Sequence, residues 1–329
     1  MIPGISGGLI LRLVFWNDTM ALQYDEIGQR LRAFRLGSGL SADEVADRLG
    51  ISRTALYRFE KGELAKIETL ERLSELLQVS LPTLLGVGIE YIPSAVSYFE
   101  RIRQLEETAE HIVVLAGPIS FLLGSDSFEM ALEQVLQESI PDNLPNRNRA
   151  LADIDKIMKI LHARKLAYRR RRPPIVNLIS AMQIEPFMNN GLVGRVSLTE
   201  SKKLVRREMA RAEIEHFASV IEEESIGVQI GLVTDCLPQN GFQIFRRRTG
   251  DTLTISPFRL GEQPNVRVGV AMATSAPEAL ALHENVVKEV WRTAIKGREA
   301  AAYLRKLVSN SQDQLEKPIK ERAPTDTRR

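Results

Sequence analysis

The sequence predicts a multidomain protein in which an all-α headpiece of five helices precedes a larger α/β domain. The chain has 329 residues, of which 44% are hydrophobic, so it is long enough for two or three domains with real cores. Within 24–85, apolar residues recur at helical spacing between clear stop signals. Beyond residue 93, helical patterns alternate with short aliphatic runs that are typical of buried strands.

Composition excludes several classes of protein. The net charge is only +2, so any nucleic-acid surface must be local and not spread over the molecule. The single cysteine, Cys236, can form no internal disulfide, which agrees with a reducing compartment. The apolar stretch 9–16 is interrupted by Arg12 and is far shorter than a bilayer span. We therefore expect a cytoplasmic protein with no membrane segment and, with only four histidines, no metal site or cofactor.

Composition shifts along the chain predict its divisions. The first nineteen residues continue no register of the following segment, and we expect a disordered extension, with Met20 as an alternative natural start. Two glycines and a proline between the compact helical unit and the rest indicate a linker. The last residues are polar and are expected to be disordered. The predicted divisions are extension 1–19, headpiece 20–85, linker 86–93, α/β domain 94–308 and tail 309–329.

The second and third helices of the headpiece have the pattern of a helix-turn-helix. Ser41 caps the second helix and, with Glu44 three residues later, forms a capping box. Gly50 tolerates the positive φ that a tight turn needs, and Ser52 caps the third helix. Apolar positions face inward, and the residues left on the outer face of the third helix are Arg53, Thr54, Tyr57, Arg58 and Lys61. Arginine, threonine, tyrosine and lysine side chains can read base edges or hold phosphates.

The segment LSADEVADRLGISRTALYRFEKG, residues 40–62, resembles the helix-turn-helix of the XRE, phage-repressor and Cro family, and the resemblance extends over the whole five-helix unit. It implies double-stranded DNA as the partner. The implied base readers are Arg53, Thr54, Tyr57 and Arg58, and the implied backbone contacts are Ser41, Ser52 and Lys61. Family members usually carry Gln at the second position of the bracing helix, where this chain has Ala42, which puts one phosphate contact in doubt.

The resemblance also implies a structural ion pair between Arg35, near the end of the first helix, and Glu60, near the end of the third. Acidic residues offset the arginines of the headpiece, so useful affinity requires two half-sites read by a homodimer. Residues 94–110 carry one apolar stripe and are a candidate inter-subunit helix, although packing on its own domain is the more common fate of such a stripe.

For the α/β domain, we expect helices over 94–110, 127–140, 149–168, 199–224 and 276–308, and strands over 111–116, 175–180, 227–234, 242–247, 252–255 and 266–272. The order of HIVVLAGP, IGVQIGLVTD and VRVGVAMATSAPEAL is weakly similar to phospholipase-D-like sensor domains. The His-x-Lys pair that an active member needs is absent, and no Walker, GxSxG or GxGxxG motif occurs. We expect no enzyme.

Two basic clusters stand out in this domain: a run that includes Arg164, Lys165, Arg169, Arg170, Arg171 and Arg172, and the triplet Arg246, Arg247 and Arg248. One interpretation is a solvated helix end and an exposed strand end, where cations meet the helix dipole favourably. The other is an anion site for an effector, or extra contacts to flanking DNA, since arginine offers a planar fork to phosphate oxygens.

The sequence as a whole predicts a transcriptional regulator that reads a two-fold operator and is modulated by a small-molecule effector. The alternative is a repressor or antitoxin-like factor whose C-terminal domain only dimerises or binds a protein partner.

Overall fold

The computed structural model describes residues 24–63, 65–195, 197–235, 241–261 and 263–320. The predicted N-terminal extension 1–19 and Cys236 lie outside the described residues, as does the end of the predicted tail, 321–329.

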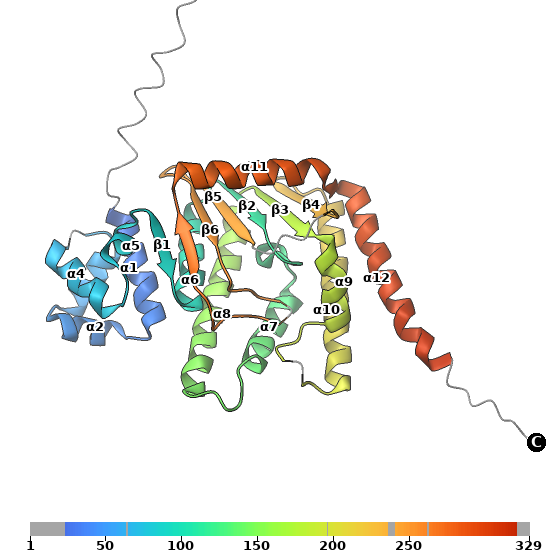
Figure 1. Cartoon of the computed structure of the whole chain (residues 1–329), viewed down its shortest axis with the longest axis horizontal. Coiled ribbons are helices and arrows are strands. Elements are labelled where there is room, and N and C mark those ends of the chain that lie inside the picture. Colours follow the sequence, from blue (N-terminus) through green and yellow to red (C-terminus); the bar gives the residue numbers. More distant parts are fainter. Residues whose placement is uncertain (1–23, 64, 196, 236–240, 262, 321–329) are drawn as a thin grey trace, which may run out of the picture.

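Five helices form the headpiece, at the blue end of the chain in Figure 1. They are α1 (Tyr24–Ser38), α2 (Ala42–Leu49), α3 (Arg53–Glu60), α4 (Ile67–Leu76) and α5 (Leu81–Leu85). Serine side chains cap α2, α3 and α5 by accepting a backbone N–H of the first turn. The helices pack around fully buried aliphatic side chains, one from each helix: Leu31, Val45, Leu56, Leu73 and Leu84.

A mixed sheet of eight strands forms the centre of the larger domain, in the order β1-β7-β6-β5-β2-β3-β4-β8. The strands are β1 (Ile89–Ile92), β2 (His111–Leu115), β3 (Ile175–Ser180), β4 (Val228–Val233), β5 (Phe242–Arg246), β6 (Thr252–Ile255), β7 (Ala271–Thr274) and β8 (Ile295–Lys296). β2, β3 and β4 are parallel neighbours, and every other pairing is antiparallel. The parallel strands are almost entirely buried, as strands covered on both faces must be.

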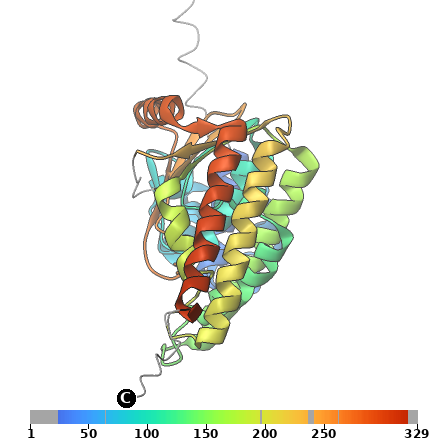
Figure 2. The same cartoon turned by 90° about the vertical axis from the view of Figure 1, so that its right-hand side faces the viewer.

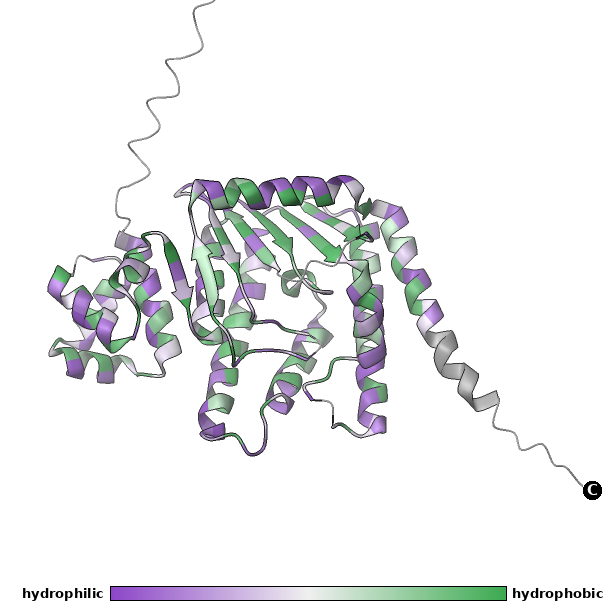
Figure 3. Cartoon of the chain, in the orientation of Figure 1, coloured by the Kyte–Doolittle hydropathy of each residue, from purple (hydrophilic) through white to green (hydrophobic). Residues whose placement is uncertain are grey.

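Helices cover both faces of this sheet (Figure 1). α11 (Pro277–Thr293) lies across one face and packs Leu280 and Trp291 against it. The opposite face is covered by α6 (Ala95–Thr108), α7 (Asp126–Glu138), α8 (Arg147–Arg171), α9 (Ile184–Asn190), α10 (Glu200–Glu222) and α12 (Gly297–Lys320). Figure 2 shows α12, in red, beside α10, in yellow. In Figure 3 the central strands are mainly hydrophobic, whereas α11 carries both hydrophobic and hydrophilic residues, as a helix with one buried face should. Two short 3₁₀ turns, Phe121–Leu123 and Ala181–Gln183, follow β2 and β3.

The segment 86–93, interpreted from the sequence as a linker, contains β1 and is part of the sheet. Gly86 does end α5 in a left-handed conformation, with φ of 73°. The four residues from Ile89 then alternate exposed and buried, and β1 pairs antiparallel with β7. Glycines and a proline flank these residues, as in a linker, but the four residues between them have the two-residue period of a strand.

Three other boundaries differ from the sequence-based expectation. The strand expected over 266–272 begins only at Ala271, because Asn265 closes a turn in which its Oδ1 accepts the Val268 N–H at 3.1 Å. The helix expected over 276–308 is two helices, α11 and α12, since β8 pairs with β4 and Gly297 turns the chain with φ of 57°. The tail expected to be disordered from residue 309 is helical to Lys320. Its Ser311 is buried, and Oγ accepts the Arg211 Nε–H at 3.2 Å.

The apolar stripe of α6 lies inside its own chain and is not an inter-subunit surface. Val96, Phe99, Ile102 and Leu105 are all buried. The helix packs against α8 of its own domain and against α1 of the headpiece. The candidate inter-subunit helix 94–110 is therefore the internal link between the two parts of the molecule.

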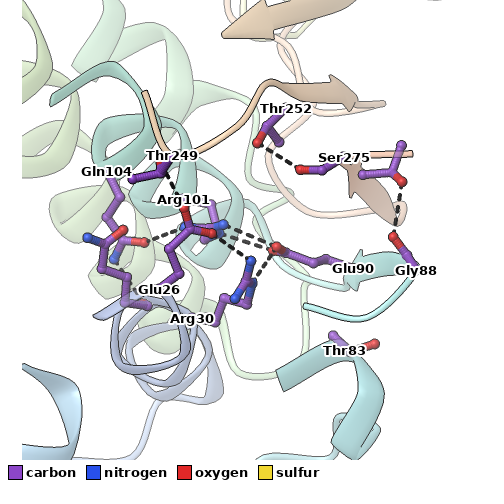
Figure 4. Close-up of polar contacts among 12 residues, drawn as sticks. Glu26, Arg30, Thr83, Gly88, Glu90, Arg101, Gln104, Thr249, Thr252 and Ser275 are labelled. Carbon is purple, nitrogen blue, oxygen red and sulfur yellow. Dashed lines mark hydrogen bonds and ion pairs between the residues drawn. The ribbon is translucent and has the colours of Figure 1, made fainter. Parts of the chain in front are cut away.

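A buried carboxylate sits where the headpiece meets the sheet (Figure 4). Glu90 of β1 accepts hydrogen bonds from Arg101 of α6, Nε to Oε2 at 3.1 Å and Nη2 to Oε1 at 3.1 Å. Arg30 of α1 also donates from Nε to Glu90. All three side chains are buried, with at most 9% of any of them exposed. One carboxylate thus joins an element of the headpiece, an edge strand and a covering helix.

The network continues to the turn between β5 and β6. Glu26 of α1 accepts from Arg30 at 2.9 Å and from Arg247 Nη1 at 2.7 Å. Arg247 follows β5, and its Nη2 donates to Thr252 Oγ1 at 2.9 Å. The Thr249 hydroxyl donates to Glu26 at 3.3 Å. Contacts between residues more than 200 positions apart therefore tie α1 to the β5–β6 turn (Figure 4).

Opposite charges control the ionisation of Glu90. Burial by itself raises the pKa of this carboxyl, but the guanidinium charges of Arg101 and Arg30 outweigh burial and lower the pKa from 4.5 to about 2. Because the folded-state pKa lies below the ordinary value, Glu90 contributes stability that is complete above pH 4.5 and is lost as the pH falls toward 2.

We expect Glu90→Gln to lower the free energy of unfolding at neutral pH by about 3 kcal/mol, since the substitution leaves two buried guanidinium groups facing a neutral partner. It should also flatten the dependence of unfolding free energy on pH between 4.5 and 2. Urea melts at a series of pH values measure both effects. Glu68→Gln, at an exposed site of α4, is the matched control and should leave the profile of the native protein unchanged. An unaltered profile in Glu90→Gln would contradict the assignment.

Candidate nucleic-acid interface

Helices α2 and α3 are joined by a turn of two residues whose geometry is set by glycine. Gly50 has φ of 66° and ψ of 34°, the left-handed region that a side chain disfavours. Its N–H donates to the Asp47 carbonyl at 3.1 Å, and the Ile51 N–H donates to the Ala46 carbonyl at 3.0 Å. These bonds end α2 and send the chain directly into α3.

The serine caps form as the sequence predicts. Ser41 Oγ accepts the Glu44 N–H at 3.1 Å, and the Ser41 N–H donates to Glu44 Oε2 at 2.7 Å, which completes the capping box. Ser52 Oγ accepts the Ala55 N–H at 3.1 Å. Both serines therefore fix the first turn of a helix, and their remaining backbone N–H groups lie at a positive helix end.

One face of α3 is open to solvent. The exposed residues on it are Arg53, Thr54, Tyr57 and Arg58, with Lys61 exposed just after the helix. The opposite face carries Leu56, which is fully buried, and Glu60. The five residues named from the sequence as DNA contacts on this helix thus lie on its accessible side.

The two outer arginines are held by neighbouring side chains in the free protein. Arg53 donates to the Tyr57 hydroxyl from Nε at 3.2 Å and Nη2 at 3.1 Å, and its guanidinium lies 5.3 Å from the centre of the Tyr57 ring. It also pairs with Asp43 at 3.2 Å, and Arg58 pairs with Glu63 at 3.4 Å. More than half of each of these charged side chains is exposed, so water and salt screen the pairs. A DNA base or phosphate can replace the carboxylates at little cost.

The base of α3 is fixed to α1 by the ion pair that the sequence analysis names. Arg35 donates from Nε and, at 3.0 Å, from Nη2 to the two carboxylate oxygens of Glu60, and both residues are buried. The helices also approach closely at Gly28, where an added Cβ would lie 2.5 Å from the Phe59 carbonyl oxygen. A planar two-point contact and a glycine contact therefore set how α3 projects from the headpiece.

The comparison with protein families agrees with this geometry. Residues 26–85 match the model of a family described as a helix-turn-helix domain. The headpiece is a helix-turn-helix domain. No curated protein matches the chain. The matched range begins within α1 and ends with α5, so it covers the headpiece and none of the larger domain. A helix-turn-helix domain suggests a DNA-binding regulator.

The arginine clusters of the larger domain do not converge on one anion site. Arg169 pairs with Asp126, and Arg171 donates to backbone carbonyls at the end of α6, including Ala109 at 3.1 Å. Arg170 and Arg172 are exposed at the end of α8.

The triplet that follows β5 is likewise occupied by acids. Arg246 pairs with Asp251 and Glu284, Arg247 with Glu26, and Arg248 with Glu110. The sequence showed the positive charges together, but of the acids that neutralise them only Asp251 is nearby, and the other three come from distant segments. Residues 169–172 also precede β3, whereas ligands of α/β sheets bind beyond the carboxyl ends of the strands.

A cavity of about 780 Å³ lies at those carboxyl ends, and the sequence analysis did not identify it. Its lining includes residues that follow β2 (Ala116 to Leu122), residues that follow β3 (Met182 and Gln183), and Arg164 from α8. The one signal in the sequence was the AGP that ends the aliphatic run of β2. Among the described residues, no group of histidine, cysteine or acidic side chains could hold a metal ion, and no helix is long and apolar enough to cross a membrane.

We expect Arg35→Ala and Glu60→Ala each to destabilise the headpiece by about 3 to 5 kcal/mol, because either change leaves a buried charge without its partner. Thermal melting and DNA binding should then fail together. Arg72→Ala, which removes an exposed arginine of α4 in the same headpiece, is the control and should retain the melting temperature of the native protein. Full stability with lost DNA binding would instead place Arg35 or Glu60 among the DNA contacts.

Proposed function

We propose that this chain is a cytoplasmic, sequence-specific transcriptional regulator of the XRE and Cro type that binds a two-fold DNA operator as a homodimer. The observation that carries the proposal is the exposed face of α3, where arginine, threonine and tyrosine side chains stand on an α-helix, an element that the width of the major groove admits.

The side chains of this face divide into two roles in the proposal. Arg53 and Arg58 grip guanine edges, and Thr54 and Tyr57 contact neighbouring bases. Ser41, Ser52 and Lys61 hold the phosphate backbone and fix the register of the helix in the groove. Before DNA arrives, Arg53 pairs with Asp43 and Arg58 pairs with Glu63, and a base or phosphate would replace these exposed carboxylates.

The larger domain is, in this proposal, a sensor without catalytic activity, as its weak similarity to inactive phospholipase-D-like sensor domains implies. The cavity beyond β2 and β3 supports modulation by a small-molecule effector over the alternative of a domain that only dimerises or binds a protein. Contacts between α6 and α1 supply a direct mechanical connection from this domain to the headpiece.

We expect Arg53→Ala and Arg58→Ala each to lower discrimination between operator and scrambled DNA by roughly ten- to a hundredfold, since each removes a two-point contact to a base. The melting temperature should not change, because both side chains are exposed. Gel shifts on genomic sites selected by the native protein measure the discrimination. Arg72→Ala removes the same charge from an exposed position of α4 and serves as the control. Equal selectivity in all three variants would refute the assignment of α3 as the recognition helix.

We expect the full chain to be a dimer at micromolar concentration, and to bind DNA with two half-sites far more tightly than DNA with one. Half-sites one helical turn apart, about 34 Å, place two recognition helices on the same side of the duplex. Light scattering gives the oligomeric state, and titration of the two DNAs gives the affinities. A monomer that binds single half-sites as tightly would rule out the two-fold arrangement.

A further inference from the structure

We propose that the cavity at the carboxyl ends of β2 and β3 binds a small amphipathic carboxylate, with its carboxylate at Arg164 and its apolar body against a wall of aromatic rings. The inference deepens the proposed function, because it rests on the larger domain being the sensor of the regulator.

The cavity has the size and position of a ligand site. Its volume, about 780 Å³, lies within the range of roughly 300 to 1,000 Å³ that small-molecule pockets occupy. It opens beyond the carboxyl ends of two parallel strands, the position at which sheets of this kind bind their ligands. Its walls come from α6, from the segments after β2 and β3, from α8, and from the segment between β6 and β7.

The walls are mainly apolar. Four aromatic side chains line the cavity, from three separate segments of the chain: Tyr98, Phe99, Phe121 and Phe258. Three of these side chains are buried within the fold, so their positions are fixed before any ligand enters. An apolar ligand body of aliphatic or aromatic carbon would therefore replace water along most of the surface it touches.

One charged group is set into this apolar wall. Arg164 is only 5% exposed, and it donates from Nε at 2.9 Å and from Nη2 at 2.8 Å to the carboxylate of Glu106. Its guanidinium also lies 5.8 Å from the centre of the Phe99 ring and 5.3 Å from that of Phe121. Neither contact uses Nη1, which makes no hydrogen bond to any residue that the structure describes. The glutamate and the rings hold the guanidinium in place, and a donor remains for the ligand.

The lining itself favours an anion, although Glu106, which is not a lining residue, balances the charge of Arg164. The described lining residues include two arginines, Arg164 and Arg259, and no aspartate or glutamate. Gln183 and Ser120 add uncharged polar groups beside them. A free phosphate would need many more donors than this wall offers, whereas a carboxylate needs few and tolerates apolar neighbours on its other side. An amine of the same shape would meet the arginines and no acid.

The same helix reaches from the cavity to the headpiece. Tyr98 and Phe99 of α6 line the cavity, and Arg101, two residues later, holds Glu90 and faces Arg30 of α1. A ligand that displaces α6 by a fraction of an ångström therefore acts on the ion pairs that orient α1. Allosteric coupling requires a ligand that binds one of two conformations of the protein more tightly than the other, and contact with α6 would provide that difference.

Titration calorimetry on the full-length protein, without DNA, tests the inference. The probes are the fatty acids from hexanoate to palmitate and three naphthyl compounds of matched shape, 1-naphthylacetate, 1-naphthylacetamide and 2-(1-naphthyl)ethylamine. We expect saturable binding of carboxylates from both series and at least about tenfold weaker binding of the amide and the amine. Absence of binding by every carboxylate, or equal binding of the three naphthyl compounds, would overturn the proposal.

Two variants locate the site. Gly117→Phe places a ring in the cavity, and its Cβ would meet only Gln183 Oε1 at 3.4 Å, so binding should be lost while the fold is kept. The double variant Arg164→Gln with Glu106→Gln removes both charges of the buried pair together and should abolish the preference for carboxylate over amide. Arg248→Gln, at a side chain 90% exposed, is the control. Native affinity in both test variants would place any binding elsewhere and overturn the site.

A gel shift on the same preparations separates the two levels of proposal. If the protein binds DNA but no carboxylate, the proposed function as a regulator stands and the proposed ligand class is wrong. Carboxylate binding without DNA binding would sustain the ligand site and contradict the proposed function.

Discussion

The arrangement of this molecule depends on one buried carboxylate. Glu90 lies on the strand that follows the headpiece, and it is contacted by Arg30 from below and Arg101 from the side. Buried charges are costly unless every one is paired, so this cluster is stable only when α1, β1 and α6 are all in place. Such a requirement favours one relative placement of headpiece and sheet over the many that hydrophobic contact alone would allow.

Buried arginine–glutamate pairs also hold two other parts of the molecule in place. Arg35 and Glu60 fix α3 on α1, and Arg164 and Glu106 fix the guanidinium in the cavity wall. In each case a carboxylate holds an arginine by two of its nitrogens, which sets both position and plane. The arginines on the outer face of α3 differ, since their acidic partners are exposed and exchangeable. Burial thus separates the pairs that build the molecule from the pairs that a nucleic acid can replace.

Local patterns were sufficient to predict the headpiece and much of the sheet. Caps such as Ser41, the turn at Gly50 and the aliphatic run 175–180 each act within a few residues, so a single sequence reveals them. The strand at 89–92 and the pairing of Arg247 with Glu26 depend on segments more than a hundred residues away. The break at Gly297 depends on one short strand pairing. Arg164 was noticed as part of a basic run, and only the fold shows that it stands apart from that run, inside a cavity.

The pairing of β1 with β7 also bears on whether the two parts can be exchanged between proteins. β7 would be an edge strand without β1, and an unpaired edge is a template for association with other chains. The polypeptide that leaves the headpiece therefore covers the edge of the sheet in the larger domain. A chimera that joins this headpiece to another C-terminal domain, or this larger domain to another headpiece, has to carry residues 89–92 with the sheet. If the chain were divided at Gly86 or Gly88 instead, the larger domain would lose β1, and its sheet would be prone to aggregation at the exposed β7 edge.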